Sequence, residues 1–161
     1  MHLKVMKHIF LSSLIILNLS LSAQPIISKS DSIKLLQRAD SIVNRLGWGC
    51  GKAPRPTPAV KFMEDIAINS KAELPLLIHS QNPSIKYLAV ILCEHYEKKG
   101  LIKLDQTKKS LIVNASSSNE IVKTCSGCTI REEKTLGWLL HERKDWDLKF
   151  WLRRIDQSKK E

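Results

Sequence analysis

Apolar residues recur three or four positions apart along much of this chain, which is the spacing of one face of an α-helix. The spacing predicts a first helix over residues 31–46, which Gly47 closes. Thr57 and Pro58 begin the next helix, where the missing amide hydrogen of proline costs nothing. Further helices are predicted over residues 70–79, from 82 to 98 or 99, and over 131–143.

The helical spacing fades between residues 101 and 124. Two aliphatic segments flank the polar run 114–119, a pattern that favours two short strands or extended loops around a turn. The last stretch, from Asp145, fits a final helix or a short strand with a frayed end. The predicted fold class is therefore mainly α: a small bundle of about five helices, with a short extended or β region around residues 110–124.

The first 23 residues have the pattern of a cleavable signal peptide. Lys4 and Lys7 give a basic start, residues 9–21 form an apolar run, and Ala23 supplies a small residue for cleavage. The alternative is a membrane anchor, but a helix that crosses a bilayer needs about 20 apolar residues. This run is shorter and contains serines and an asparagine. We therefore expect an exported protein, periplasmic or secreted, whose residues 24–161 form a single small helical domain.

Residues 73–92 combine a leucine-rich helix, an Asn-Pro turn and a second helix with a lysine and an inward-facing alanine near its start. This arrangement resembles a HEAT repeat, which is a pair of antiparallel helices. The resemblance implies a HEAT-like hairpin over about residues 57–100 and a role in scaffolding or protein binding. Only one unit is visible, whereas HEAT arrays stack several. The matching positions are Leu74, Leu77 and Ile78, then Asn82 and Pro83, then Ile85, Lys86, Ala89 and Leu92.

The chain is basic, with 26 lysines and arginines against 16 acidic residues and a net charge of +10. Removal of the signal peptide would take two lysines and leave 24 basic residues, a net charge of +8. Outside the cytoplasm such a charge serves solubility or contact with anionic lipid, cell-wall polymer or polysaccharide. No nucleic-acid-binding motif occurs, so we do not expect a nucleic-acid partner.

The four cysteines are expected to form disulfides, because an exported chain meets an oxidising environment. Cys125 and Cys128 are two residues apart, a spacing that a tight turn bridges, whereas Cys50 lies in a loop and Cys93 on an apolar helix face. The favoured pattern is Cys125–Cys128 with Cys50–Cys93. The alternative is Cys50–Cys128 with a free, buried Cys93.

Two chemical interpretations of these cysteines stay open. A thiol–disulfide redox protein would use Cys125 and Cys128, although the chain lacks the tryptophan and the βαβ pattern of thioredoxin-like proteins. A zinc site would need two more ligands, and no second pair has metal spacing. We expect neither a metal site nor a cofactor. The ligands that could complete a zinc site are Cys50, Cys93, His79, His95 and His141.

The C-terminal tail mixes aromatic and basic residues. It can form a peripheral contact with a membrane or an acidic partner, but a domain this short of core favours inward packing of the rings. The candidate surface residues are Trp146, Lys149, Phe150, Trp151, Arg153 and Arg154.

No phosphate-binding loop, nucleophile turn or paired catalytic carboxylates stand out in the sequence. We therefore expect a non-enzymatic interaction or scaffold module of HEAT-like type whose partner is another protein or an envelope component. The alternative function is thiol–disulfide redox or metal handling by the Cys125–Cys128 pair.

Overall fold

The computed structural model describes residues 28–51, 55–126, 130–142 and 146–158. It is mainly helical with one two-stranded antiparallel sheet, which confirms the predicted fold class. The predicted signal peptide and Cys128 lie outside the described residues. The elements are α2 (Lys29–Asp40), α3 (Pro58–Asn69), the 3₁₀ helix η2 (Lys71–His79), α4 (Pro83–Lys98), α5 (Gln106–Ser116), β1 (Ile121–Ser126), β2 (Ile130–Thr135), α6 (Leu136–His141) and α7 (Trp146–Gln157).

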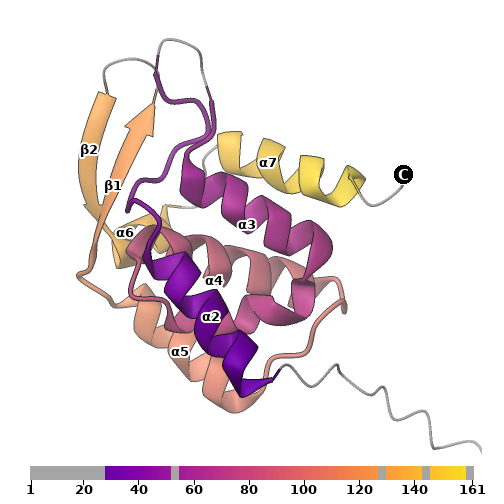
Figure 1. Ribbon diagram of the computed structural model, residues 1–161. Helices are drawn as coiled ribbons and strands as arrows, with labels where there is room; N and C mark the ends of the chain where they lie inside the picture. The colour runs from indigo at the N-terminus through magenta and orange to yellow at the C-terminus, as the bar shows by residue number, and fades with distance from the viewer. Residues whose placement is uncertain (1–27, 52–54, 127–129, 143–145, 159–161) are drawn as a thin grey trace, which may run out of the picture.

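Helix α4 is the centre of the core. From Ile85 to Cys93 every residue except Lys86 is buried, and α3, η2, α5 and α6 all pack against this helix. Asn82 caps its start by accepting a hydrogen bond from the backbone N–H of Ser84, and Pro83 follows in the first turn. The prediction for this helix is confirmed, including its end before Gly100, which has the left-handed φ of 69°. Figure 1 shows the sheet at one end of the helices that surround α4, with α7 above α3.

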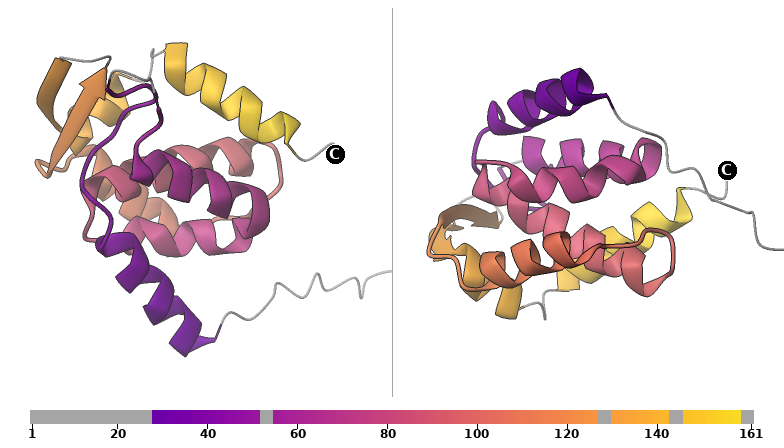
Figure 2. Two further views of the ribbon diagram at one scale, coloured as in Figure 1. Left: turned by 45° about the horizontal axis from the view of Figure 1, so that its top comes forward. Right: turned by 90° about the horizontal axis from the view of Figure 1, so that it is seen from below.

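Helix α2 ends earlier than the predicted helix over 31–46, because its C-terminal residues have better partners elsewhere. The side-chain amide of Asn82 donates to the carbonyl of Ile42 over 2.6 Å, and the side chain of Asn44 donates to the carbonyl of Ile121. These bonds hold residues 41–46 in a non-helical path towards β1. Only Ala39 of α2 is buried, and Figure 2 shows the helix lying on the outside of the fold.

The β region begins later than predicted. The prediction of extended structure from residue 110 is wrong for the first part, since Gln106–Ser116 is helix α5. Asp105 caps this helix by accepting from the N–H of Lys108, and Ile112 and Ala115 are buried one turn apart. Strands β1 and β2 follow, and the helix predicted over 131–143 starts only at Leu136, after its cap Thr135.

The segment predicted to be a short helix over 70–79 is the 3₁₀ helix η2, which contains Pro75. It packs against α4 after the turn at Ser80 to Asn82. The Oγ of Ser80 donates to Asp40 over 2.5 Å, so the turn also ties α2 to the core. The resemblance of this helix pair to a HEAT repeat stays a prediction.

The C-terminal tail forms a helix, α7, rather than the alternative short strand. Its buried positions are Leu148, Trp151 and Ile155, which are spaced three and four residues apart and face the core. Within the ranges described above, no helix is both long and apolar enough to cross a membrane.

Candidate binding site beside the disulfide

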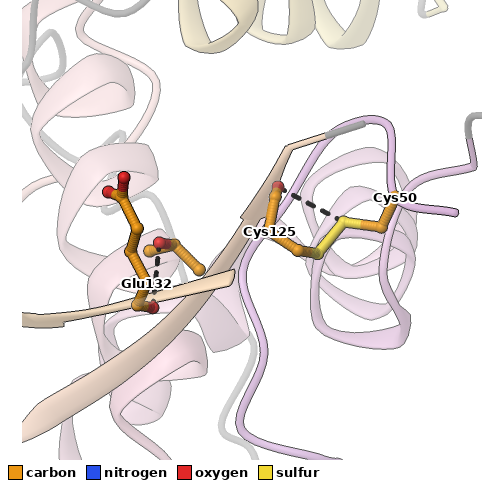
Figure 3. Close-up of a disulfide and its surroundings, with 4 residues drawn as sticks. Cys50, Cys125 and Glu132 are labelled. Atoms are coloured by element: carbon orange, nitrogen blue, oxygen red, sulfur yellow. Dashed lines mark hydrogen bonds between the residues drawn. A yellow bond between two sulfur atoms is a disulfide. The ribbon is translucent and has the colours of Figure 1, made fainter. Parts of the chain in front are cut away.

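A disulfide joins Cys50, in the loop between α2 and α3, to Cys125 in β1. The two Cα atoms are 5.8 Å apart, and 75 residues separate the cysteines in sequence. Backbone pairing brings them together, because the N–H of Leu46 donates to Lys123 over 2.8 Å and the N–H of Cys125 donates back to Leu46 over 2.9 Å. The loop thus runs beside β1 as a short parallel bridge before it reaches Cys50 (Figure 3).

Gly47 makes this approach sterically feasible. A Cβ at this position would overlap the Sγ of Cys50 and the carbonyl oxygen of Cys125, and would lie 2.7 Å from the Sγ of Cys125. The sequence prediction gave Gly47 the role of ending a helix, but its structural role is to leave room for the disulfide. Its carbonyl also accepts from the N–H of Thr57 over 2.9 Å, which links the loop to the start of α3.

The predicted disulfide pattern is wrong. Cys125 bonds to Cys50, so neither the Cys125–Cys128 bridge nor the Cys50–Cys93 bridge forms. The alternative pattern, Cys50–Cys128, fails for the same reason, although its free, buried Cys93 is confirmed. Burial raises the pKa of the Cys93 thiol to about 12, and Glu94 and Glu97 add to the shift. A thiol in that environment is a poor nucleophile.

A cavity of about 430 Å³ opens beside the disulfide, and we call it the disulfide cavity. The loop, both strands, α4, α6 and the start of α7 all contribute to its wall. Three aromatic rings and three carboxylates line it, together with one lysine. The lining residues used below are Trp48, Tyr87, Trp138, Glu132, Glu142, Asp147 and Lys134.

Strand β2 presents Glu132 and Lys134 to this cavity, since residues two apart in a strand share a face. The ammonium of Lys134 lies 2.8 Å from the Glu132 carboxylate and 4.4 Å from the centre of the Trp138 ring. The site therefore already holds one cation, which is bound by a carboxylate and by the face of an aromatic ring. The intervening Glu133 points to the other face of the sheet.

Helix α7 closes another part of the wall. The ring of Trp151, only 2% exposed, lies 5.0 Å from the ring of Trp48, so the tail helix supports the loop that carries the disulfide. The same helix brings Asp147 to the cavity. On its outer side the Arg154 guanidinium pairs with Glu64 of α3 over 2.5 Å.

The structure divides the predicted surface residues of the tail between core and surface. Trp151 is buried, whereas Phe150 is 54% exposed and Lys149 and Arg153 are exposed. Arg154 is exposed and paired. Trp146 begins α7, and its side chain lies outside the described part of the structure.

The histidines considered as metal ligands do not gather. Among the described residues no three histidines, cysteines or acidic residues lie close enough to hold a metal ion. His95 instead contacts the Asp156 carboxylate over 3.1 Å, which links α4 to α7. His79 and His141 are exposed on other elements.

Comparisons with known proteins identify no relative: no family model, curated protein or solved structure matches this chain. The interpretation of the site therefore depends on its own chemistry. Sequence reasoning singled out the cysteines but missed the acidic and aromatic residues of the disulfide cavity. The alternation of Glu132 and Lys134 was the signal available, but it was hidden because that stretch was predicted to be helical.

Proposed function

We propose that this protein is an exported, non-enzymatic interaction module that binds a cationic group of a partner protein in the disulfide cavity. The observation that carries this proposal is the cavity's composition. Three carboxylates and three aromatic rings gather there in a chain whose net charge is +10. The basic composition of the chain does not explain why three of its acidic residues line one cavity. We therefore take this cluster of acidic residues as an indication of a binding site.

The chemistry of the lining favours a lysine or arginine side chain as the group bound. Aromatic faces attract cations within about 6 Å of the ring, and carboxylates add charge-assisted hydrogen bonds. Lys134 already makes both kinds of contact inside the same cavity. These contacts support a cation as the group bound, and a partner's cation would bind beside Lys134, at Glu142, or in its place.

Two further features support export and scaffolding. The Cys50–Cys125 bond is compatible with an oxidising compartment, as the signal-peptide pattern of residues 1–23 requires. The η2–α4 pair, in which the HEAT resemblance lies, supplies Tyr87 to the cavity wall. The repeat-like unit would thus serve as the rigid support of the site.

The test is a titration followed by NMR or calorimetry, with Nα-acetyl-lysine methylamide as the probe and its uncharged norleucine analogue as the reference. We expect the lysine probe to bind in the disulfide cavity and the norleucine probe to bind at least about tenfold more weakly, because it lacks the charge. Equal affinity for both probes would contradict the proposal.

Matched variants locate the site. Glu142→Gln should weaken binding of the lysine probe about fivefold, whereas Glu133→Gln, the same change on the other face of the sheet, should leave it unchanged. Lys134→Met should strengthen binding, because the internal competitor is gone, and Lys123→Met serves as its control. Equal effects of Glu142→Gln and Glu133→Gln would mean that only overall charge matters. Insulin reduction with turnover, lost in Cys125→Ser, would favour the redox alternative instead.

A further inference from the structure

A second cavity, of about 540 Å³, lies between α2, η2 and the segment that leads into α5. We call it the basic cavity, and it shares no lining residue with the disulfide cavity. Its charged side chains are three lysines, with a histidine beside them, and it contains no carboxylate. The lining residues are Ser32, Lys71, Ala72, Pro75, Leu76, His79, Leu101, Ile102, Lys103 and Lys108.

The turn after α4 builds the apolar side of this cavity. Gly100 adopts a left-handed φ of 69°, and the N–H of Leu101 donates to the carbonyl of Tyr96 over 2.9 Å. The chain is thereby directed past η2, and Leu101 and Ile102 line the cavity together with Leu76 of η2. Leu101 remains 52% exposed, so a large apolar side chain is left in contact with water at this position.

The cations of the basic cavity are only partly neutralised by the chain itself. Lys108 pairs with Asp105, the cap of α5, and the ammonium of Lys71 lies 5.5 Å from the centre of the Tyr96 ring. Lys103 and Lys71 form no ion pair with any residue that the structure describes. The positive charge of Lys71 and Lys103 therefore lies beside exposed apolar surface, and no carboxylate in the described part of the chain pairs with it.

Lysines alone would carry no inference, because a chain of net charge +10 has many solvated lysines. The combination is what matters. A simple anion would not use the apolar side formed by Leu76, Leu101 and Ile102, and an uncharged apolar ligand would not use the lysines. A ligand with an anionic head and an apolar body would use both, and the volume lies in the range of small-molecule sites.

We propose that the basic cavity binds a single-chain anionic amphiphile, such as a fatty acid. Lys103 and Lys71 hold its carboxylate, and the chain lies against Leu76, Leu101 and Ile102. The site takes a dissolved molecule rather than a membrane, because a concave cavity between helices encloses one chain whereas a bilayer needs a raised apolar surface. This assignment is independent of cation binding in the disulfide cavity.

The experiment uses laurate below its micellar concentration, with dodecanol as the uncharged chain and acetate as the head alone. Binding is followed by methyl NMR of the leucines and isoleucines, since the cavity contains no tryptophan. We expect laurate to shift the signals of Leu76, Leu101 and Ile102, with dodecanol at least about tenfold weaker and acetate without effect. Acetate as effective as laurate would reduce the site to a general anion site, and dodecanol as tight as laurate would reduce it to an apolar patch; either result overturns the proposal.

Matched substitutions separate the site from general charge and general hydrophobicity. Lys103→Gln should weaken laurate binding about fivefold, and Lys123→Gln, the same change on the sheet, should not. Leu101→Ser should weaken it to a similar extent, and Val113→Ser, which alters a residue 64% exposed on α5, should not. All four substituted residues are exposed, so we expect each variant to fold.

Two further measurements test whether the ligand is a dissolved molecule or a membrane, and whether the basic cavity is independent of the disulfide cavity. If the protein sediments with phosphatidylglycerol vesicles but does not respond to laurate, the proposal is overturned in favour of a membrane contact. Glu142→Gln should leave laurate binding intact. Loss of laurate binding in Glu142→Gln would contradict the separate site, whereas failure of the lysine probe alone would contradict only the proposed function.

Discussion

The two cavities differ in charge and in how their walls are held. The disulfide cavity is acidic and aromatic, and a covalent bond, strand pairing and the buried ring of Tyr87 fix its wall. The basic cavity is bounded by a 3₁₀ helix, a turn and α2, a helix that buries only Ala39. A net charge of +10 therefore predicts the second cavity and not the first. Acidic residues that cluster in a basic chain are therefore a stronger indication of a specific site than the lysines that its net charge predicts.

The largest expected effect comes from removing the disulfide, which should affect the two cavities unequally. Cys50→Ala with Cys125→Ala opens a loop of 75 residues and should lower the free energy of unfolding by about 4 kcal/mol. Urea denaturation measures this, and reductant should bring the wild type to the same midpoint. The lysine probe should bind far more weakly while laurate binding survives in the folded fraction. Cys93→Ala, which spares the bond, is the control and should cost about 1–2 kcal/mol.

A single methyl group at Gly47 should have the next largest effect. Gly47→Ala forces a Cβ onto Cys50 and Cys125, so we expect a loss of about 2–3 kcal/mol in unfolding free energy. Thermal denaturation and thiol counting measure it, and free thiols should appear beyond those of the wild type. Gly51→Ala has open space but a φ of 89° and should cost only about 1 kcal/mol. Equal costs for the two variants would contradict the packing role of Gly47.

Asn82 holds the C-terminal end of α2, the helix that contributes Ser32 to the basic cavity. Its side-chain oxygen accepts from Ser84 over 3.0 Å while its amide donates to Ile42 over 2.6 Å. Asn82→Ala should cost about 2 kcal/mol and should speed hydrogen exchange in α2. Asn82→Asp keeps the cap but loses the donor, so it should restore α4 and leave α2 loosened. Unchanged hydrogen exchange in α2 for both variants would contradict the role of Asn82 in holding α2.

The smallest expected effect concerns the link between α7 and α4. Burial alone would raise the pKa of Asp156, but hydrogen bonds from Lys99 and His95 outweigh it and hold the pKa below its ordinary value near 3.8. A lowered pKa in the folded state stabilises at neutral pH, and this stability is lost as the pH falls through the folded value. Asp156→Asn should therefore cost about 1 kcal/mol at pH 7.

The difference between wild type and Asp156→Asn should shrink towards zero in urea titrations below pH 3.8. Asp65→Asn, at an exposed carboxylate of α3, is the control. A difference that stayed constant with pH would show that the ion pair does not provide the stability. Because α7 carries Asp147, binding of the lysine probe should fall slightly in Asp156→Asn, with laurate binding unchanged.

The helices with complete local signals could be predicted from the sequence. Helix α4 has its Asn-Pro start, its apolar face and Gly100 at its end, so nothing outside the helix was needed to define it. Helix α5 was missed, because the Leu111-Ile112-Val113 trio suggests a strand unless Asp105 is recognised as a cap. The early end of α2 could not be predicted, since it depends on hydrogen bonds to Asn82 and Ile121, distant in sequence.

The candidate site was less accessible to prediction than the fold. The cysteine pairing is decided by a bridge between Leu46 and Thr124, which no local spacing encodes. The Cys125–Cys128 bridge was predicted because the two cysteines are close in sequence. Strand β1, however, continues through Ser126, and Cys125 bonds to Cys50 in the loop instead. Residues of the cavity come from segments between positions 46 and 147, and only the tertiary fold brings them together.

The Cys50–Cys125 bond also turns the middle of the protein into a covalent ring. Helices α3, η2, α4 and α5 lie inside the ring, whereas α2 precedes it and β2, α6 and α7 follow it. A protease that cuts once within the ring releases no fragment until the bond is reduced, whereas a cut outside it frees an end at once. Limited proteolysis should thus remove the wall helices α2 and α7 before it can remove α4.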